Sequence, residues 1–323
     1  MLKQAYCLVL FMLAMPVVVC GEAPEPAALS ELFPPELVKF EVYEGNPIFA
    51  AGDKDSWDRQ IRERGWIRKE GSLWRMYYTG YDSTEEGLRM LGYATSSDGI
   101  HWERAADNPI HSDRWVEDVC VVSHDGLYYL FAEGEPRSHW MTSTDGVKWT
   151  PQGELNIHNT KGERTRVGAA TPCVFVDDDD GSWNLYYQNT GGVWYARGDG
   201  PEKWTNVIDE PVIHAGPEWY DSNKAATDQV FKHKGRYYMY YHGRGKKQIY
   251  ETYLAVSEDK LNWQKYPGNP VIGNNYSSGI TVHDGERFRM YTMHDAVRLF
   301  WSTPDAEENT AGELVFPPQT EPA

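Results

Sequence analysis

The chain of 323 residues carries 48 Asp and Glu residues against 31 Lys and Arg, so its formal net charge at pH 7 is −17. A polypeptide this acidic repels nucleic acid and anionic lipid surfaces, which excludes both classes of partner. Aromatic residues make up 14% of the sequence, with 13 Trp and 21 Tyr. This content favours β-strands and supplies flat apolar faces on which a ligand can stack.

The N-terminal residues 1–20 form an apolar run after Lys3, too short and too close to the start for a membrane span. They predict a secretory signal peptide, and therefore a secreted or periplasmic protein. Cys20 leaves a lipid-anchored N-terminus open as an alternative. Residues 21–40 are rich in Pro, Ala and Glu and predict a tether of low structural content.

A three-part pattern then recurs five times along the chain. Its central element is an aromatic segment, found at residues 73–81, 127–135, 183–191, 236–244 and 287–295. A strand and a Gly-containing turn precede each segment, and a further strand and a turn follow it. In the first two units this last part reads "YATSSDGIHW" (93–102) and "WMTSTDGVKW" (140–149).

This repetition predicts an all-β fold, a five-bladed β-propeller over residues 41–317. The tryptophans that end the first four units, at positions 102, 149, 204 and 263, lie 47, 55 and 59 residues apart. Because they recur from unit to unit, we expect them to pack between blades. To close the ring, we expect the fifth blade to take a strand either from the N-terminal segment near residues 38–45 or from residues 312–316.

The first strand of each blade lines the axis of a propeller, and residues at one end of these strands form a funnel. When the inner strands are aligned on their last apolar residue, Ile67 matches Val122, and four residues earlier Glu63 matches Asp118. Acids near a crowded axis are costly unless they are paired or solvated. Glu63 and Asp118 are therefore the first candidates for a functional site.

The motifs around these acids resemble the five-bladed propeller glycosidases, which include glycoside hydrolase families 43, 32, 68 and 117 and, more distantly, family 130. The likeness rests on "SWDRQIRERGWIRKEG" in blade one, "WVEDVCVVSHDGLYYLF" in blade two and "TPCVF" in blade three. It implies three acids in the funnel: a base or nucleophile in blade one, an orienting acid in blade two and a general acid in a later blade. A carboxylate stabilises an oxocarbenium-like transition state, while a protonated carboxyl group meets the leaving oxygen.

Carried onto this chain, the resemblance assigns Asp118 as the blade-two acid. Two residues compete for the blade-one acid. Glu63 has the better register, whereas Asp58 has the expected residue type. Asp58 follows Trp57 as Asp221 follows Tyr220 in blade four, so Asp58 could instead be a repeated structural turn acid.

The general acid stays open, because several relatives have a Glu before a Pro where this chain has Thr171. Glu133 or Glu135, after the second strand of blade two, could reach the funnel. Asp228 in blade four is the other candidate. For each of these acids, the alternative is a solvated loop residue.

Sugar-binding candidates are basic and aromatic residues near the acids, where a guanidinium can grip hydroxyl or carboxylate groups and an indole can stack on a sugar ring. They are Arg64, Arg164, Arg166, His242, Trp57, Trp66 and Trp115. The alternatives are surface or structural roles for the basic residues and inter-blade packing for Trp66.

No cofactor or metal is expected from the sequence. The acidic run at residues 177–181 falls between two strands, where a solvated turn explains it better than a calcium site. No Cys/His spacing suggests zinc. Cys120 and Cys173 follow the leader, and they could form a disulfide or remain two buried thiols.

These observations predict an exported glycoside hydrolase that acts on an oligo- or polysaccharide by carboxylate acid/base chemistry. One alternative is a mannoside-type phosphorylase with a basic phosphate pocket, although export argues against phosphorolysis. The other is a non-catalytic carbohydrate-binding propeller, which the missing blade-three Glu would explain.

Overall fold

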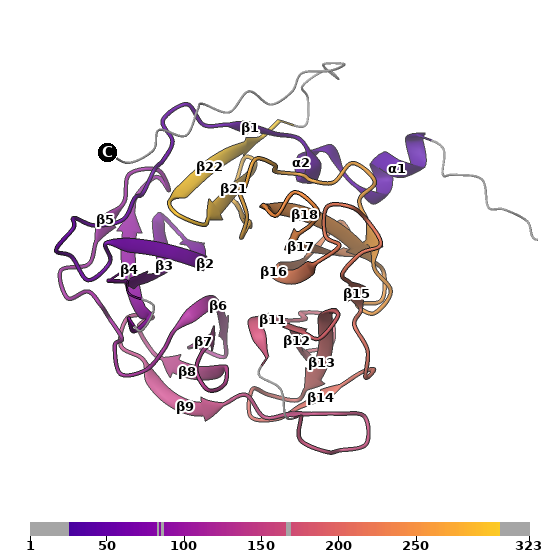
Figure 1. Ribbon diagram of the computed structural model, residues 1–323, viewed down its shortest axis with the longest axis horizontal. Coiled ribbons are helices and arrows are strands. Elements are labelled where there is room, and N and C mark those ends of the chain that lie inside the picture. The colour runs from indigo at the N-terminus through magenta and orange to yellow at the C-terminus, as the bar shows by residue number, and fades with distance from the viewer. Residues whose placement is uncertain (1–25, 83, 85–86, 166–168, 304–323) are drawn as a thin grey trace, which may run out of the picture.

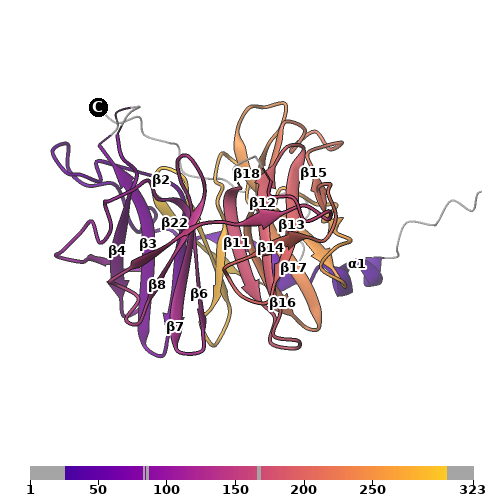
Figure 2. The same ribbon diagram turned by 90° about the horizontal axis from the view of Figure 1, so that it is seen from below.

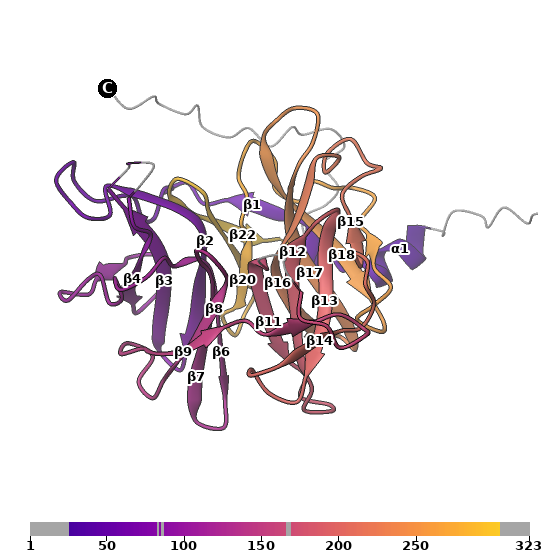
Figure 3. The same ribbon diagram turned by 60° about the horizontal axis from the view of Figure 1, so that its bottom comes forward.

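Five mainly antiparallel sheets surround a central axis in the computed structural model, which describes residues 26–82, 84, 87–165 and 169–303 (Figure 1). In the side views, most strands of these sheets run roughly along this axis (Figures 2 and 3). The predicted all-β five-bladed propeller is confirmed. The predicted signal peptide, residues 1–20, lies outside the described residues.

The strands follow one another around the ring in chain order. Blade one contains β2 (Gln60–Glu70), β3 (Leu73–Tyr81), β4 (Met90–Ser96) and β5 (Glu103–Arg104). Blade two contains β6 (Glu117–His124), β7 (Leu127–Glu133), β8 (His139–Ser143) and β9 (Thr150–Glu154). Blade three contains β11 (Ala170–Val176), β12 (Trp183–Asn189), β13 (Gly192–Gly198) and β14 (Trp204–Asn206), extended by β10 (Ile157–His158) and β15 (Ile213–His214).

The last two blades complete the ring. Blade four contains β16 (Lys224–His233), β17 (Arg236–Arg244), β18 (Tyr250–Ser257) and β19 (Gln264–Lys265). Blade five contains β20 (Ile280–His283), β21 (Phe288–Met293) and β22 (Val297–Ser302). Its fourth strand is β1 (Phe40–Val42), which pairs antiparallel with β22. An N-terminal strand therefore closes the ring, which was one of the two predicted ways of closure. The other predicted closing strand, residues 312–316, lies outside the described residues.

The segment expected to be a tether of low structural content is ordered from Pro26. It forms α1 (Pro26–Leu32) and α2 (Pro35–Val38), and Phe33 and Leu37 are buried in a cluster with Tyr238 and Tyr240. The Tyr240 hydroxyl donates to the Leu37 carbonyl at 2.7 Å. Apolar residues within a Pro- and Glu-rich stretch explain why this segment packs onto the propeller. Among the described residues, no helix is long and apolar enough to cross a membrane.

The repeated Asp-Gly turns join neighbouring blades. In blade two, the Asp145 carboxylate accepts the backbone N–H groups of Val147 and Lys148, both at 2.8 Å. Gly146 has φ 74°, and its carbonyl accepts the hydroxyl of Tyr77 from blade one at 2.8 Å. Gly suits this place, because a Cβ there would lie 2.8 Å from the Tyr77 hydroxyl oxygen.

The tryptophans that follow these turns pack between blades, as predicted. Trp149, Trp204 and Trp263 each meet an aromatic ring of the preceding blade edge-on, at centroid distances of 5.9, 6.1 and 5.7 Å. Edge-to-face contacts of this kind add to the apolar burial. Cys120 and Cys173 lie on the inner strands β6 and β11 and are free, buried thiols, which settles the open alternative against a disulfide.

Candidate active site

A β-bulge interrupts the inner strand of each of blades one to four near its start. The register with the neighbouring strand shifts between residues 62 and 66, 117 and 120, 170 and 173, and 227 and 229. Glu63, Asp118 and Thr171 lie in these bulges with φ of 66°, 47° and 46°. Such backbone conformations cost roughly 1–3 kcal/mol each in a non-Gly residue and cluster at functional sites. The equivalence of Glu63 and Asp118, expected from the alignment, is therefore seen in the backbone.

Arg64 points to the propeller axis instead of the funnel. Its side chain is fully buried, and its guanidinium donates to backbone carbonyls of three other blades. The acceptors are the carbonyl oxygens of Asp118, Val119 (3.3 Å), Thr171 (3.5 Å), Pro172 (2.6 Å), Thr227 (2.8 Å) and Asp228 (3.1 Å). The predicted sugar contact for Arg64 is corrected to a structural one, because no donor is left to face a ligand.

Glu63 and Asp118 lie on the neighbouring inner strands of blades one and two and interact electrostatically. The backbone N–H of Arg64 donates to Oδ1 of Asp118 at 2.8 Å, and Arg62 pairs with Glu63 at 2.9 Å. Burial and the negative charge of Asp118 raise the pKa of Glu63 to about 7. Glu63 can therefore gain or lose a proton near neutral pH.

Glu133 completes the group from the end of β7. Its Oε2 accepts the backbone N–H of Thr171 in the blade-three bulge at 2.8 Å. Burial and the charge of Asp118 raise the pKa of Glu133 to about 8. Glu135, the other candidate in this loop, is exposed to solvent. The structure thus brings Glu63, Asp118 and Glu133 together and leaves Glu135 outside.

Glu117 belongs to the same acidic group, although the sequence analysis did not single it out. It accepts the indole N–H of Trp115 at 2.6 Å and pairs with Arg89 at 3.5 Å. Burial raises its pKa. Its negative charge raises the pKa of both Glu63 and Glu133. The available signal was its position beside Asp118 in "WVED".

Asp228 and His242 form a separate buried pair in blade four. Nδ1 of His242 lies 2.6 Å from Oδ1 of Asp228, and the N–H of Gly279 donates to Oδ2 at 3.2 Å. The Asp228 side chain has no exposed surface. Since both oxygens are engaged, Asp228 is poorly placed to give a proton to a substrate.

Asp58 lies outside the acidic group, which favours its reading as a structural acid. It accepts hydrogen bonds from Ser56, from Tyr78 at 3.0 Å and from Arg104 on the outermost strand at 2.9 Å. Burial opposes ionisation, but these hydrogen bonds outweigh it and lower the pKa of Asp58. Asp221 repeats the arrangement in blade four with Tyr241 and Lys265, at 3.1 and 2.6 Å.

Of the remaining sugar-binding candidates that the structure describes, only Trp115 lies beside the acids. Trp66 is buried in the core, and Trp57 stacks on Tyr78 at 5.9 Å, so both serve packing. Trp115 is half-buried and contacts Glu117 and Arg89, which leaves it beside the site. Arg164 pairs with Glu154 at 3.0 Å, and Arg166 lies outside the described residues.

The acidic turn at residues 177–181 is paired with cations. Asp177 is buried and bonded to Lys260 at 2.6 Å and to Tyr237 at 2.8 Å, and Asp180 pairs with Arg197 at 3.2 Å. Within the described ranges, no cluster of three His, Cys, Asp or Glu residues could hold a metal ion.

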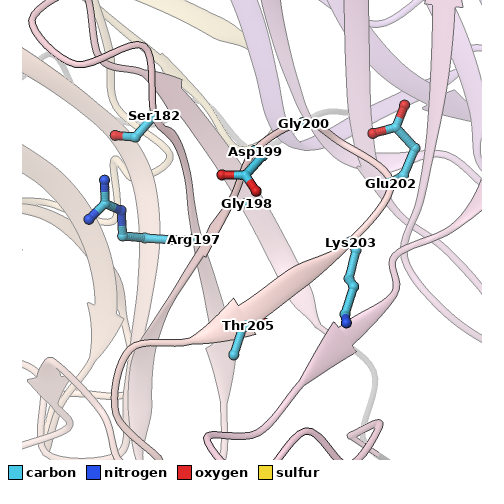
Figure 4. Close-up of a pocket in the computed structure, with 8 residues that line it drawn as sticks. All are labelled: Ser182, Arg197, Gly198, Asp199, Gly200, Glu202, Lys203 and Thr205. Carbon is cyan, nitrogen blue, oxygen red and sulfur yellow. The ribbon is translucent and has the colours of Figure 1, made fainter.

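Two of the cavities of the structure differ in how they lie relative to the acids. A cavity of about 660 Å³ lies at the outer edge of blade three, lined by Arg197, Asp199, Glu202 and Lys203 among others (Figure 4). None of the acids described above lines it. A small cleft between blades one and five is lined by Arg62, Glu63 and Met293. The acids are the stronger candidate for a functional site, because carboxyl groups with strongly shifted pKa values cluster at such sites.

Comparison with known proteins agrees with the fold. A 1,2-β-oligomannan phosphorylase of Thermoanaerobacter sp. (strain X514) is 21% identical over 297 residues, covering 81% of this chain and 96% of that protein. A crystal structure of a glycosyl hydrolase from Bacteroides ovatus superposes with a TM-score of 0.69 at 16% identity, covering 82% and 93% of the two chains. The resemblance to the five-bladed β-propeller glycosidase superfamily is confirmed.

A further structure of this superfamily comes from work on the GH130 family of mannoside phosphorylases, which contains glycoside hydrolases that target β-1,2-mannosidic linkages in Candida mannan. It has a TM-score of 0.66 and 17% identity and covers 81% of this chain and 93% of its own. No protein-family model matches the sequence.

Proposed function

We propose that this propeller hydrolyses glycosidic bonds, with Glu133 as the general acid and Glu63 as the base or nucleophile. The observation that carries the proposal is the group formed by Glu63, Asp118 and Glu133, in which burial and mutual repulsion raise two pKa values to about 7 and about 8. Carboxyl groups pushed to different pKa values in one site are the usual sign of paired acid and base roles.

The chemistry follows from these protonation states. Near pH 7.5 Glu133 retains its proton and Glu63 has mostly lost its own. Glu133 would give its proton to the leaving oxygen, while Glu63 would either deprotonate an attacking water or attack the anomeric carbon itself. Asp118 would orient the sugar and keep the proton on Glu133 by repulsion.

Product analysis on a panel of oligosaccharides and aryl glycosides tests this proposal. We expect reducing sugar to form with wild-type protein, and the rate to fall by about 10²–10⁴ in the Asp118→Asn, Glu63→Gln and Glu133→Gln variants. Glu135→Gln is the matched control, because Glu135 lies in the same loop and is exposed. Equal turnover in the wild type and all three variants would exclude these acids from catalysis.

Phosphorolysis is the second candidate function, supported by the likeness to 1,2-β-oligomannan phosphorylase along most of both chains. The two reactions differ in their products. Hydrolysis releases a free reducing sugar without phosphate, whereas phosphorolysis releases a sugar 1-phosphate only when phosphate is present. Nuclear magnetic resonance of the products with and without phosphate distinguishes them, and with β-1,2-linked oligomannosides it tests the mannoside alternative directly.

A further inference from the structure

Two cationic side chains gather at the funnel end of blade four around one aromatic ring. Lys224 begins β16, Arg244 ends β17 and Tyr250 begins β18, and these residues are register partners across the three strands. Nζ of Lys224 and Cζ of Arg244 each lie 5.7 Å from the centre of the Tyr250 ring. The rings of His242 and His294 lie 5.9 and 5.8 Å from it. Tyr250, which is half-buried, is therefore bordered by nitrogen-bearing side chains.

Lys224 and Arg244 have no acidic side chain within salt-bridge distance among the residues that the structure describes. Neither side chain forms an ion pair there, and Nε of Arg244 is buried without a hydrogen-bond acceptor. A buried donor without an acceptor costs free energy. This is unusual in a chain with 17 more acids than bases, so the two cations suit an anion that is supplied from outside the protein.

The cations belong to the same funnel as the acids. The positive charge of Lys224 lowers the pKa of both Glu63 and Glu133, in opposition to burial. Arg62 is already paired with Glu63. Burial lowers the pKa of His294 to about 4, so this imidazole is neutral at neutral pH. Lys224 and Arg244 are thus the charges left for a ligand.

We propose that Lys224 and Arg244, beside the Tyr250 ring, bind a singly charged oxyanion carried by the sugar, so that the substrate is an acidic glycan bearing a carboxylate or a sulfate ester. This proposal rests on the proposed glycosidase function. The Arg fork matches the oxygens of such a group, and the Tyr ring gives a flat face for the sugar that bears it. A doubly charged phosphate fits less well, because Asp118 and Glu117 already place negative charge in the same funnel, where they raise the pKa of Glu63 and Glu133.

The surface next to Lys224 and Arg244 also combines basic side chains with an aromatic ring. Trp219 is 42% exposed, and Nζ of Lys247 lies 4.9 Å from its ring centre. The N–H of Lys246 donates to the Trp219 carbonyl at 3.0 Å, which fixes the basic turn against the Trp loop. An exposed indole with lysines beside it continues the surface on which further residues of an acidic glycan can lie.

The test compares matched substrates and matched variants. The substrates are a hexuronide, the hexoside of the same configuration and aglycone, and its sulfated derivative, tested with Lys224→Met and Arg244→Gln. Lys232→Met is the control, because Lys232 lies in the same strand but pairs with Asp179 on the surface. We expect wild-type kcat/KM for an anionic substrate to exceed that for the neutral one by about tenfold or more. We expect each site variant to lose most of this preference and the control to keep it.

The outcomes separate the two proposals. Equal kcat/KM for anionic and neutral substrates would overturn the oxyanion site while leaving the glycosidase function in place. A cation effect that appears only with inorganic phosphate and yields a sugar 1-phosphate would overturn both the oxyanion site and the hydrolytic function, in favour of phosphorolysis. Calorimetry with the free uronate gives a readout without turnover: binding that is weakened about tenfold in Lys224→Met, but not in Lys232→Met, supports the site even if no glycoside is hydrolysed.

Discussion

The Glu133→Gln variant tests the proposed mechanism most directly. Oε2 of Glu133 accepts the backbone N–H of Thr171 at 2.8 Å, and the carbonyl oxygen of a glutamine can accept the same hydrogen bond. The substitution therefore removes the acidic proton with little change in shape. At pH 7, a pKa of about 8 leaves roughly nine-tenths of the Glu133 side chains protonated in the wild type.

The expected loss is that of a general acid. Proton donation to the leaving oxygen contributes about 10²–10⁴ in rate, which corresponds to roughly 3–5 kcal/mol in the activation barrier. The size of the loss depends on the leaving group. A sugar alkoxide leaves poorly without a proton, whereas a strongly acidic phenol leaves as a stable anion and needs little help.

The assay measures kcat/KM for an oligosaccharide and for an aryl glycoside with an acidic phenol, across pH 5–10. For Glu133→Gln we expect the full loss on the oligosaccharide and a much smaller one on the aryl glycoside. The wild-type profile should be a bell with limbs near pH 7 and pH 8, and the variant should lack the alkaline limb. An equal loss on both substrates, or an alkaline limb that persists in the variant, would refute the general-acid role.

Four further predictions follow from the same contacts. Glu63→Gln should remove the acidic limb of the pH profile of kcat/KM. If that limb stays near pH 7 in the variant, a group other than Glu63 causes it. Burial raises the pKa of Glu133 to about 8, so the folded state keeps a proton that the unfolded state loses from about pH 4.5. The free energy of unfolding of the wild type should therefore fall between about pH 4.5 and 8, relative to that of Glu133→Gln. Urea titrations should show a fall of up to a few kcal/mol. Arg64→Met should cost several kcal/mol in the free energy of unfolding by the same measurement, because it leaves buried carbonyl groups without a donor at about 1–3 kcal/mol each. Asp58→Asn should lower the melting temperature but change kcat/KM less than about twofold. The reverse result would return Asp58 to the catalytic candidates.

Repetition made the fold and part of the site predictable from the sequence. The recurring Asp-Gly turns and tryptophans mark inter-blade contacts, so they identified the blades and the register of the inner strands. That register placed Glu63 and Asp118 at equivalent positions, and the structure has both in bulges, with Thr171 in the corresponding bulge of blade three. The alignment succeeded because each blade packs against its neighbours through the same kinds of contact, and these contacts require similar residues at equivalent positions.

The orientation of Arg64 could not be predicted, since bulges break the two-residue alternation of side chains along a strand. Arg64 follows Glu63, and its side chain turns onto the axis, where carbonyls from three other blades meet it. The choice among Glu133, Glu135 and Asp228 also needed the structure. It depended on the Thr171 amide and on His242, partners that lie 38 and 14 residues away.

The bulges connect the fold to the site, because a bulge leaves backbone groups without partners in its own sheet. The freed carbonyls of blades two, three and four point to the axis, where the guanidinium of Arg64 satisfies them. Freed amides are satisfied by carboxylates of a neighbouring blade: the N–H of Arg64 in blade one by Asp118 of blade two, and the N–H of Thr171 in blade three by Glu133 of blade two. The strained backbone that seats Arg64 is thus the same backbone that orients two of the three proposed active-site acids. A substitution on the axis should therefore disturb catalysis through the positions of these carboxylates, although Arg64 itself has no donor free for a substrate.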